Sequence, residues 1–243
     1  MAKKPSVGKC VHCLADLSDG SWDHMFPKSW YPDATPENLE KWKIPSCVAC
    51  NQRYSKIEGD LLNRVGLALD ANNPASAGIV DAALRAMNPA AGRDERDVAA
   101  REARRKKMLG QMLHGEQIPQ DAVIPGMGER WSRPVAEQMA VLVPKDGLEA
   151  ISEKIVRGLV YREDNAYIEP PYKIDFFVVD EEEAKECIDL LDRHGKVFAR
   201  EPGIVIRRAV VNDDNRTALY ELNFWQQFKT YASVSKPEAP GEA

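Results

Sequence analysis

The sequence predicts an α+β protein made of three successive regions, and three observations lead to this prediction. Four of the five cysteines lie within the first 50 residues, in two pairs of identical spacing. An alanine-rich stretch after residue 70 is interrupted by prolines, which favours short helices joined by loops. After residue 144, helical and strand patterns alternate. We therefore expect the regions to span residues 1–70, 71–144 and 145–243.

The first region shows little regular periodicity until its end. A knuckle and a short hairpin are expected over residues 9–22, followed by a strand over 22–26. Apolar residues at helical spacing, which include Leu61, Leu62, Val65 and Leu69, predict an amphipathic helix over 57–69.

The middle region is predicted to be helical and to end in a loop. Helices are expected over 76–87, with Ser76 as the N-cap, and over 94–114. The second helix carries the strongest basic run of the chain, at residues 101–107. Glycines and prolines over 115–134 indicate an extended linker or a surface loop.

The third region predicts an α+β domain. Helices are expected over 147–158 and 181–194, and Gly195 closes the second one. Strands are expected over 173–179, 203–211 and 217–225, where a turn at 212–216 makes the last two a hairpin. Cys187 falls in the second helical pattern, so we expect a buried, unreactive thiol. The tail from about residue 236 is expected to be disordered.

Composition and charge are typical of a water-soluble protein. Hydrophobic residues make up 44% of the chain, charged residues 29%, and the net charge is −5. No apolar run approaches the roughly 18 residues that a membrane helix needs, and the N-terminus lacks the apolar core of a signal peptide. We therefore expect a cytoplasmic protein with no membrane partner, in which paired cysteines are metal ligands rather than disulfides.

The two cysteine pairs, Cys10-x-x-Cys13 and Cys47-x-x-Cys50, predict one structural zinc site. Each pair forms a tight knuckle that directs two thiolates at one metal, and two knuckles complete a tetrahedral site with no open position. Unpaired or disulfide-bonded cysteines are the alternative. His12, inside the first knuckle, is a further possible ligand, but an exposed knuckle position is favoured because four thiolates fill the site.

Between the knuckles lies the pair Asp23-His24, and Asn51 directly follows the last cysteine. Imidazole titrates near neutral pH and can take a proton from water. A carboxylate and an amide oxygen can bind a divalent cation, which neutralises charge on a phosphate. On a regular strand Asp23 and His24 would face opposite sides. The three residues are therefore candidates for metal-assisted hydrolysis of a phosphodiester.

The order CxxC, Asp-His-x-x-Pro and CxxC-Asn resembles the zinc-containing branch of the HNH endonucleases, also called ββα-metal or His-Me finger nucleases. The resemblance covers about residues 9–62. It implies a ββα-metal finger whose helix runs over about 52–69. It implies that His24 is the general base and that Asp23 and Asn51 bind a catalytic Mg²⁺ or Mn²⁺. It also implies structural zinc on the residues Cys10, Cys13, Cys47 and Cys50.

Two groups of basic residues are candidates for contacts with phosphate. Those flanking Asp23-His24 are explained equally well as exposed surface charge. For the run over 101–107, a solvated helix face is slightly favoured over a surface that follows a DNA backbone. Trp30 and Trp42 could stack on bases, but packing around the zinc loop is favoured. The candidate nucleic-acid-binding residues are Lys28, Arg53, Lys56, Arg104, Arg105, Lys106 and Lys107.

The leading hypothesis is a metal-dependent endonuclease that cuts DNA, with defence against foreign DNA as one setting that fits. A non-catalytic four-cysteine zinc module that binds nucleic acid or protein is the alternative, and it has no use for Asp23, His24 and Asn51. An RNA endonuclease is a further alternative, without a stacking motif in its favour. The C-terminal region could clamp substrate, form a homodimer or sense a signal, and the low basic charge suits a nuclease directed by a protein partner.

Overall fold

The computed structural model describes residues 8–119, 123–127 and 134–237, which form an α+β fold. Within these ranges there are five α-helices and three antiparallel sheets. None of the helices in the described part combines the length and the hydropathy needed to cross a bilayer. The expected disordered tail lies outside the described residues from position 238 onward.

The N-terminal part is a strand pair followed directly by a long helix. Strands β1 (Gly20–His24) and β2 (Lys43–Cys47) pair antiparallel, so that Gly20 lies opposite Cys47 and His24 opposite Lys43. Helix α1 (Val48–Ala68) begins at the end of β2, where the Cys47 thiol accepts a hydrogen bond from the backbone N–H of Cys50 at 3.4 Å. Strand β2 was not predicted from the sequence, because Pro45 interrupts any strand pattern in this short segment.

The middle part contains α2 (Ile79–Ala86) and α3 (Glu95–Leu109), joined to a small sheet of β3 (Met112–His114) and β4 (Met139–Val141). The Asp94 carboxylate caps α3 by accepting a hydrogen bond from the backbone N–H of Asp97 at 2.8 Å. The predicted helix over 94–114 was therefore right at its start and wrong at its end. Gly110 ends the helix, and the three residues 112–114 gain partners in β4 instead.

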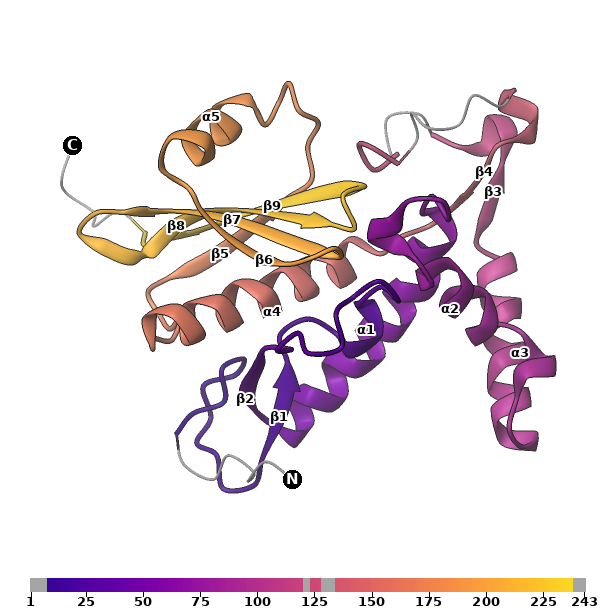
Figure 1. Ribbon diagram of the computed structural model, residues 1–243, viewed down its shortest axis with the longest axis horizontal. Coiled ribbons are helices and arrows are strands. Elements are labelled where there is room, and N and C mark those ends of the chain that lie inside the picture. The colour runs from indigo at the N-terminus through magenta and orange to yellow at the C-terminus, as the bar shows by residue number, and fades with distance from the viewer. Residues whose placement is uncertain (1–7, 120–122, 128–133, 238–243) are drawn as a thin grey trace.

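The C-terminal part is a five-stranded sheet with one helix on each face (Figure 1). Helix α4 (Lys145–Asp164) lies between this sheet and α1, whereas α5 (Lys185–His194) covers the opposite face. The helix predicted over 147–158 extends six residues further. Two strands of this sheet were not predicted, one at its edge and one in its interior. The strands, in spatial order, are β5 (Lys173–Phe177), β9 (Phe228–Ser235), β8 (Asp214–Phe224), β7 (Ile204–Val211) and β6 (Lys196–Arg200).

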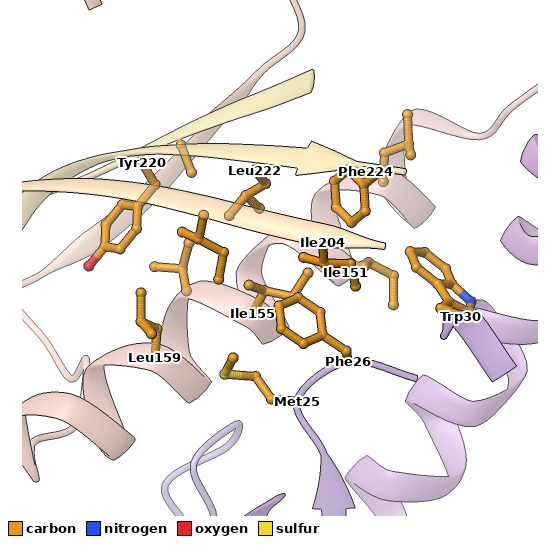
Figure 2. Packing of buried hydrophobic residues seen from close by; sticks show 14 of the residues in the cluster. Met25, Phe26, Trp30, Ile151, Ile155, Leu159, Ile204, Tyr220, Leu222 and Phe224 are labelled. Atoms are coloured by element: carbon orange, nitrogen blue, oxygen red, sulfur yellow. The ribbon is translucent and has the colours of Figure 1, made fainter. Parts of the chain in front are cut away.

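One hydrophobic core joins the N-terminal and C-terminal parts. Trp30 and Trp225 meet with their ring centroids 5.2 Å apart, and the Trp225 indole donates a hydrogen bond to the Trp30 carbonyl at 2.9 Å. Trp30 and Trp42 are both buried, so packing rather than base stacking is their structural role. The core crosses the region boundaries expected near residues 70 and 144 (Figure 2), and it includes Met25, Phe26, Ile151, Ile155, Leu222 and Phe224.

Two glycines allow α4 to approach the N-terminal part closely. A Cβ at Gly158 would lie 2.6 Å from Met25 Cγ and 3.2 Å from Ile44 Cδ1, and one at Gly147 would lie 3.2 Å from Leu61 Cδ2. These separations are all shorter than ordinary van der Waals contact. The absence of side chains at Gly147 and Gly158 therefore lets α4 pack closely against Met25, β2 and α1.

Replacing Gly158 with alanine should lower the free energy of unfolding by about 1–3 kcal/mol, because the added methyl group overpacks this contact. The matched change Gly59→Ala in α1 should raise it by about 0.5–1 kcal/mol, because no atom lies within 4 Å of the new Cβ and alanine favours the helix. Urea unfolding followed by circular dichroism measures both. Equal stabilisation by the two changes would show that α4 does not press against Met25.

Candidate functional site

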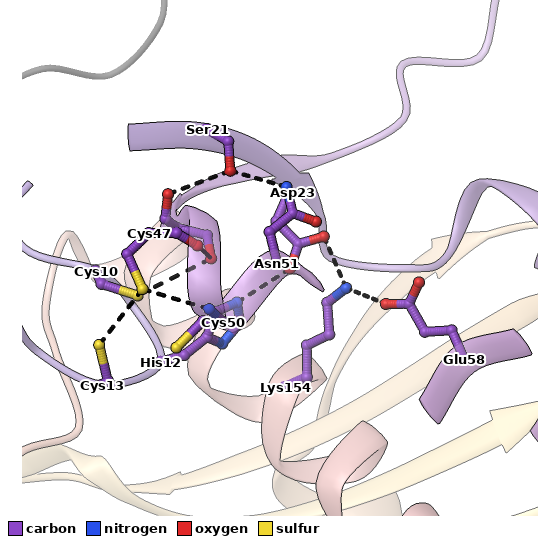
Figure 3. Close-up of polar contacts among 11 residues, drawn as sticks. Cys10, His12, Cys13, Ser21, Asp23, Cys47, Cys50, Asn51, Glu58 and Lys154 are labelled. Carbon is purple, nitrogen blue, oxygen red and sulfur yellow. Dashed lines mark hydrogen bonds and ion pairs between the residues drawn. The ribbon is translucent and has the colours of Figure 1, made fainter. Parts of the chain in front are cut away.

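Four thiols converge where the first knuckle meets the junction of β2 and α1. Their sulfur atoms all lie within 4.8 Å of one another, and the Cys13 and Cys47 sulfurs are 3.8 Å apart. A zinc ion with four Zn–S bonds of about 2.3 Å needs sulfurs about 3.8 Å apart. The cluster therefore fits structural zinc. Among the described residues it is the one group of three or more histidine, cysteine and carboxylate side chains close enough to share an ion (Figure 3).

The thiols of the cluster differ in how readily they ionise. Burial raises the pKa of Cys10, but hydrogen bonds from the backbone of Cys13 and Cys47 outweigh it and lower this pKa to about 7. Burial and the hydrogen bond with Cys47 raise the pKa of Cys50 well above its usual value. Four thiolates this close together repel one another, so a bound cation would be needed for all four to lose their protons.

Strand β1 turns Asp23 inward and leaves His24 at an intermediate exposure, as its alternation requires. The Asp23 carboxylate is only 5% exposed. Its Oδ2 lies 3.1 Å from Nε2 of His12, and its Oδ1 accepts a hydrogen bond from Nζ of Lys154 at 2.9 Å. Both oxygens of this candidate metal ligand therefore already have partners within the chain.

His12 is not the exposed knuckle residue that was expected. Its side chain is 2% exposed, and its ring lies 4.5 Å from the Tyr54 ring. Burial lowers the pKa of His12 against the opposing effect of Asp23, which favours a neutral ring. A proton on Nε2 can then be donated to Asp23, which leaves the buried Nδ1 as an acceptor without a partner among the described residues. Its position between two ligand cysteines was the only sequence signal for this role.

Lys154 of α4 completes the site, and sequence reasoning missed it. The side chain is fully buried, and its ammonium group bridges Asp23 and Glu58 (Figure 3). A signal was present in the sequence: Lys154 shares the helix face of Gly147, Ile151 and Gly158, which is the apolar face. A lysine on such a face indicates a buried carboxylate partner.

The three predicted catalytic residues line one depression of about 590 Å³. The Asn51 amide donates a hydrogen bond to the Ser21 hydroxyl at 2.8 Å, which orients it across the strand pair. Burial lowers the pKa of His24, and the positive charge of Lys43 lowers it further, so its ring is neutral at neutral pH and can accept a proton. Lys28 lines the same depression.

The oxygen atoms of Asp23, Glu58 and Asn51 form a donor set of the kind that Mg²⁺ and Mn²⁺ prefer. The chemistry of the donors therefore fits a catalytic divalent ion. Their charge, however, is compensated by Lys154, so an ion bound to Asp23 would compete with the ammonium group for Oδ1.

The remaining candidate basic residues lie apart from this depression. Arg53 and Lys56 are exposed on α1, and the Arg53 guanidinium lies 5.2 Å from the Tyr54 ring centre. Helix α3 meets α1 where Lys107 pairs with Asp60 at 3.0 Å, which is nine residues and about 13 Å of helix beyond Asn51. Arg104 donates to the Ala86 carbonyl, whereas Arg105 and Lys106 are exposed.

No family model, curated protein or solved structure matches this chain. Any functional assignment therefore depends on the motif residues and on the geometry that surrounds them.

Replacing Cys47 with serine should remove the zinc and destabilise the knuckle and the β1–β2 pair, because the metal supplies folding energy to this segment. The matched change Cys187→Ser should leave zinc content and melting unchanged, because Cys187 lies on α5, away from the cluster. Zinc per chain and thermal unfolding measure both. An unchanged melting profile for Cys47→Ser would contradict a structural site.

Replacing Lys154 with methionine should cost about 3–5 kcal/mol of unfolding free energy, because it leaves two carboxylates in a buried site without their cation. The matched change Lys185→Met removes an exposed lysine paired with Asp189 at 3.2 Å and should cost at most about 1 kcal/mol. Added Mg²⁺ or Mn²⁺ should restore stability to Lys154→Met more than to the wild type. An equal loss of unfolding free energy in the two variants would show that the buried bridge contributes no more to stability than the exposed ion pair.

Proposed function

We propose that the protein is a metal-dependent endonuclease of the HNH type that hydrolyses phosphodiester bonds in DNA. One observation carries the proposal: the β1–β2–α1 arrangement brings Asp23, His24 and Asn51 to the lining of a single depression beside the four-thiol cluster. These residues lie 28 positions apart at their extremes, and it is the strand pair and the helix start that bring them together.

In this mechanism His24 is the general base. Its neutral ring takes a proton from water as the water oxygen bonds to phosphorus. The phosphorus–oxygen bond to the leaving sugar breaks, and the released sugar oxygen takes up a proton from solvent. Asp23 and Asn51 would hold a divalent ion, and the chemistry that such an ion would supply is neutralisation of charge on the scissile phosphate. His12 orients Asp23 through the 3.1 Å contact with Oδ2. Zinc on the four cysteines supports the strand pair and takes no part in the chemistry.

A non-catalytic zinc module that binds nucleic acid or protein is the second candidate. The observation in its favour is the pair of contacts that already engage both oxygens of Asp23. The two candidates differ in what His24 does, because only a nuclease needs its imidazole.

Purified protein should nick or linearise supercoiled plasmid when Mg²⁺ or Mn²⁺ is added, and His24→Ala should lower the rate by about 10²–10⁴-fold, the usual contribution of a general base. The matched change His194→Ala, at the end of α5, should cleave as the wild type does. Zinc content and melting must be equal in all three proteins. Cleavage that persists in His24→Ala would remove the proposed base, and cleavage of RNA alone would favour the RNA endonuclease.

A further inference from the structure

A second depression adjoins the candidate active site. It has a volume of about 540 Å³ and shares His24 and Lys28 with the first. His24 therefore lies where the two depressions meet, with oxygen donors on one side of it. The residues that line the second depression alone are Glu37, Leu39, Glu40, Lys41, Lys43 and Arg162. We call these six residues, with Lys28, the cationic groove.

Positive charge prevails in the cationic groove. Its lining contains four lysine and arginine side chains against two glutamates. Glu40 is engaged by Arg162 at 3.3 Å and, more weakly, by Arg200 at 4.0 Å. In the part of the chain that the structure describes, Lys28, Lys41 and Lys43 have no carboxylate within 4.0 Å, and the Lys41 ammonium group lies 5.0 Å from the Tyr31 ring centre. These three ammonium groups are available to an anionic ligand.

The groove is built from both ends of the chain and is held rigidly. Lys41 and Lys43 flank Trp42, which is 4% exposed and anchors the segment to the core. The guanidinium groups of Arg200 and Arg162 lie 3.6 and 4.9 Å from the Trp42 ring centre. Because Arg162 belongs to α4, the C-terminal part supplies one wall of a groove whose other wall is the start of β2.

We propose that the cationic groove binds phosphates of the DNA strand that flank the scissile phosphodiester, with Lys41 and Lys43 as the main contacts. This inference rests on the proposed function, because the groove leads to His24. Lysine is a compact point charge suited to phosphate oxygens, and contacts of this kind supply most of the sequence-independent affinity for DNA. Separate cations on an open surface suit a polymer of phosphates, whereas a small anion would need a closed pocket.

The test measures DNA binding in the absence of added divalent ion, so that cleavage does not interfere. Fluorescence anisotropy of a labelled duplex is recorded for the full chain over a range of salt concentrations. Lys41→Gln/Lys43→Gln should weaken binding and reduce the slope of log affinity against log salt by about two, one for each lost phosphate contact. The matched pair Arg105→Gln/Lys106→Gln removes the same charge from the exposed face of α3 and should leave the slope unchanged.

Zinc content and melting verify that both double variants are folded, and Lys43→Arg, which keeps the charge, should bind nearly as the wild type does. An unchanged slope for Lys41→Gln/Lys43→Gln, or a loss confined to the α3 pair, would overturn the inference. The inference would also be overturned if binding to an RNA duplex showed this salt dependence and binding to a DNA duplex showed none. DNA binding that depends on the groove, without plasmid cleavage, would support the groove and count against the nuclease. Plasmid cleavage with an unchanged salt slope would support the nuclease and count against the groove.

Discussion

A single buried ammonium group ties the candidate site to the rest of the molecule. Lys154 is removed from water, and a lone charge in such a place would cost several kcal/mol. The carboxylates of Asp23 and Glu58 compensate it, so three charges from β1, α1 and α4 depend on one another. The geometry of Asp23 is thus decided by a helix 131 positions later in the chain, and residues 1–70 alone would present two carboxylates without their cation.

A second dependence runs from the thiol cluster to the same carboxylate. The first knuckle fixes His12 between two ligand cysteines, and His12 contacts the Asp23 oxygen that Lys154 leaves free. Asp23 is therefore oriented from two sides, by the zinc knuckle and by α4. Groups that orient a ligand in this way set its direction and basicity. A metal bound to the four thiols would therefore influence Asp23 without touching it.

Charge is divided around His24. Oxygen donors from β1 and α1 lie in one depression, and cations from β2 and α4 lie in the other. Such a separation suits a polyanion, because its backbone meets positive charge on one side of the reacting group while a cation can be held on the other. The basic run of α3, although it is the most concentrated in the sequence, meets α1 far from Asn51 and is partly used in structural contacts with Ala86 and Asp60.

The sequence by itself determined the features that depend on local spacing. Two CxxC pairs identified the thiol cluster, helical periodicity identified most helices, and alternation with a turn identified the β7–β8 hairpin. Tertiary structure alone decided β2, β3, β4 and β6, because strands of three to five residues acquire their identity from the partners they pair with. It also decided the burial of His12, the bridging role of Lys154 and the gathering of Lys41, Lys43 and Arg162. These depend on contacts between residues far apart in sequence, which no local pattern encodes.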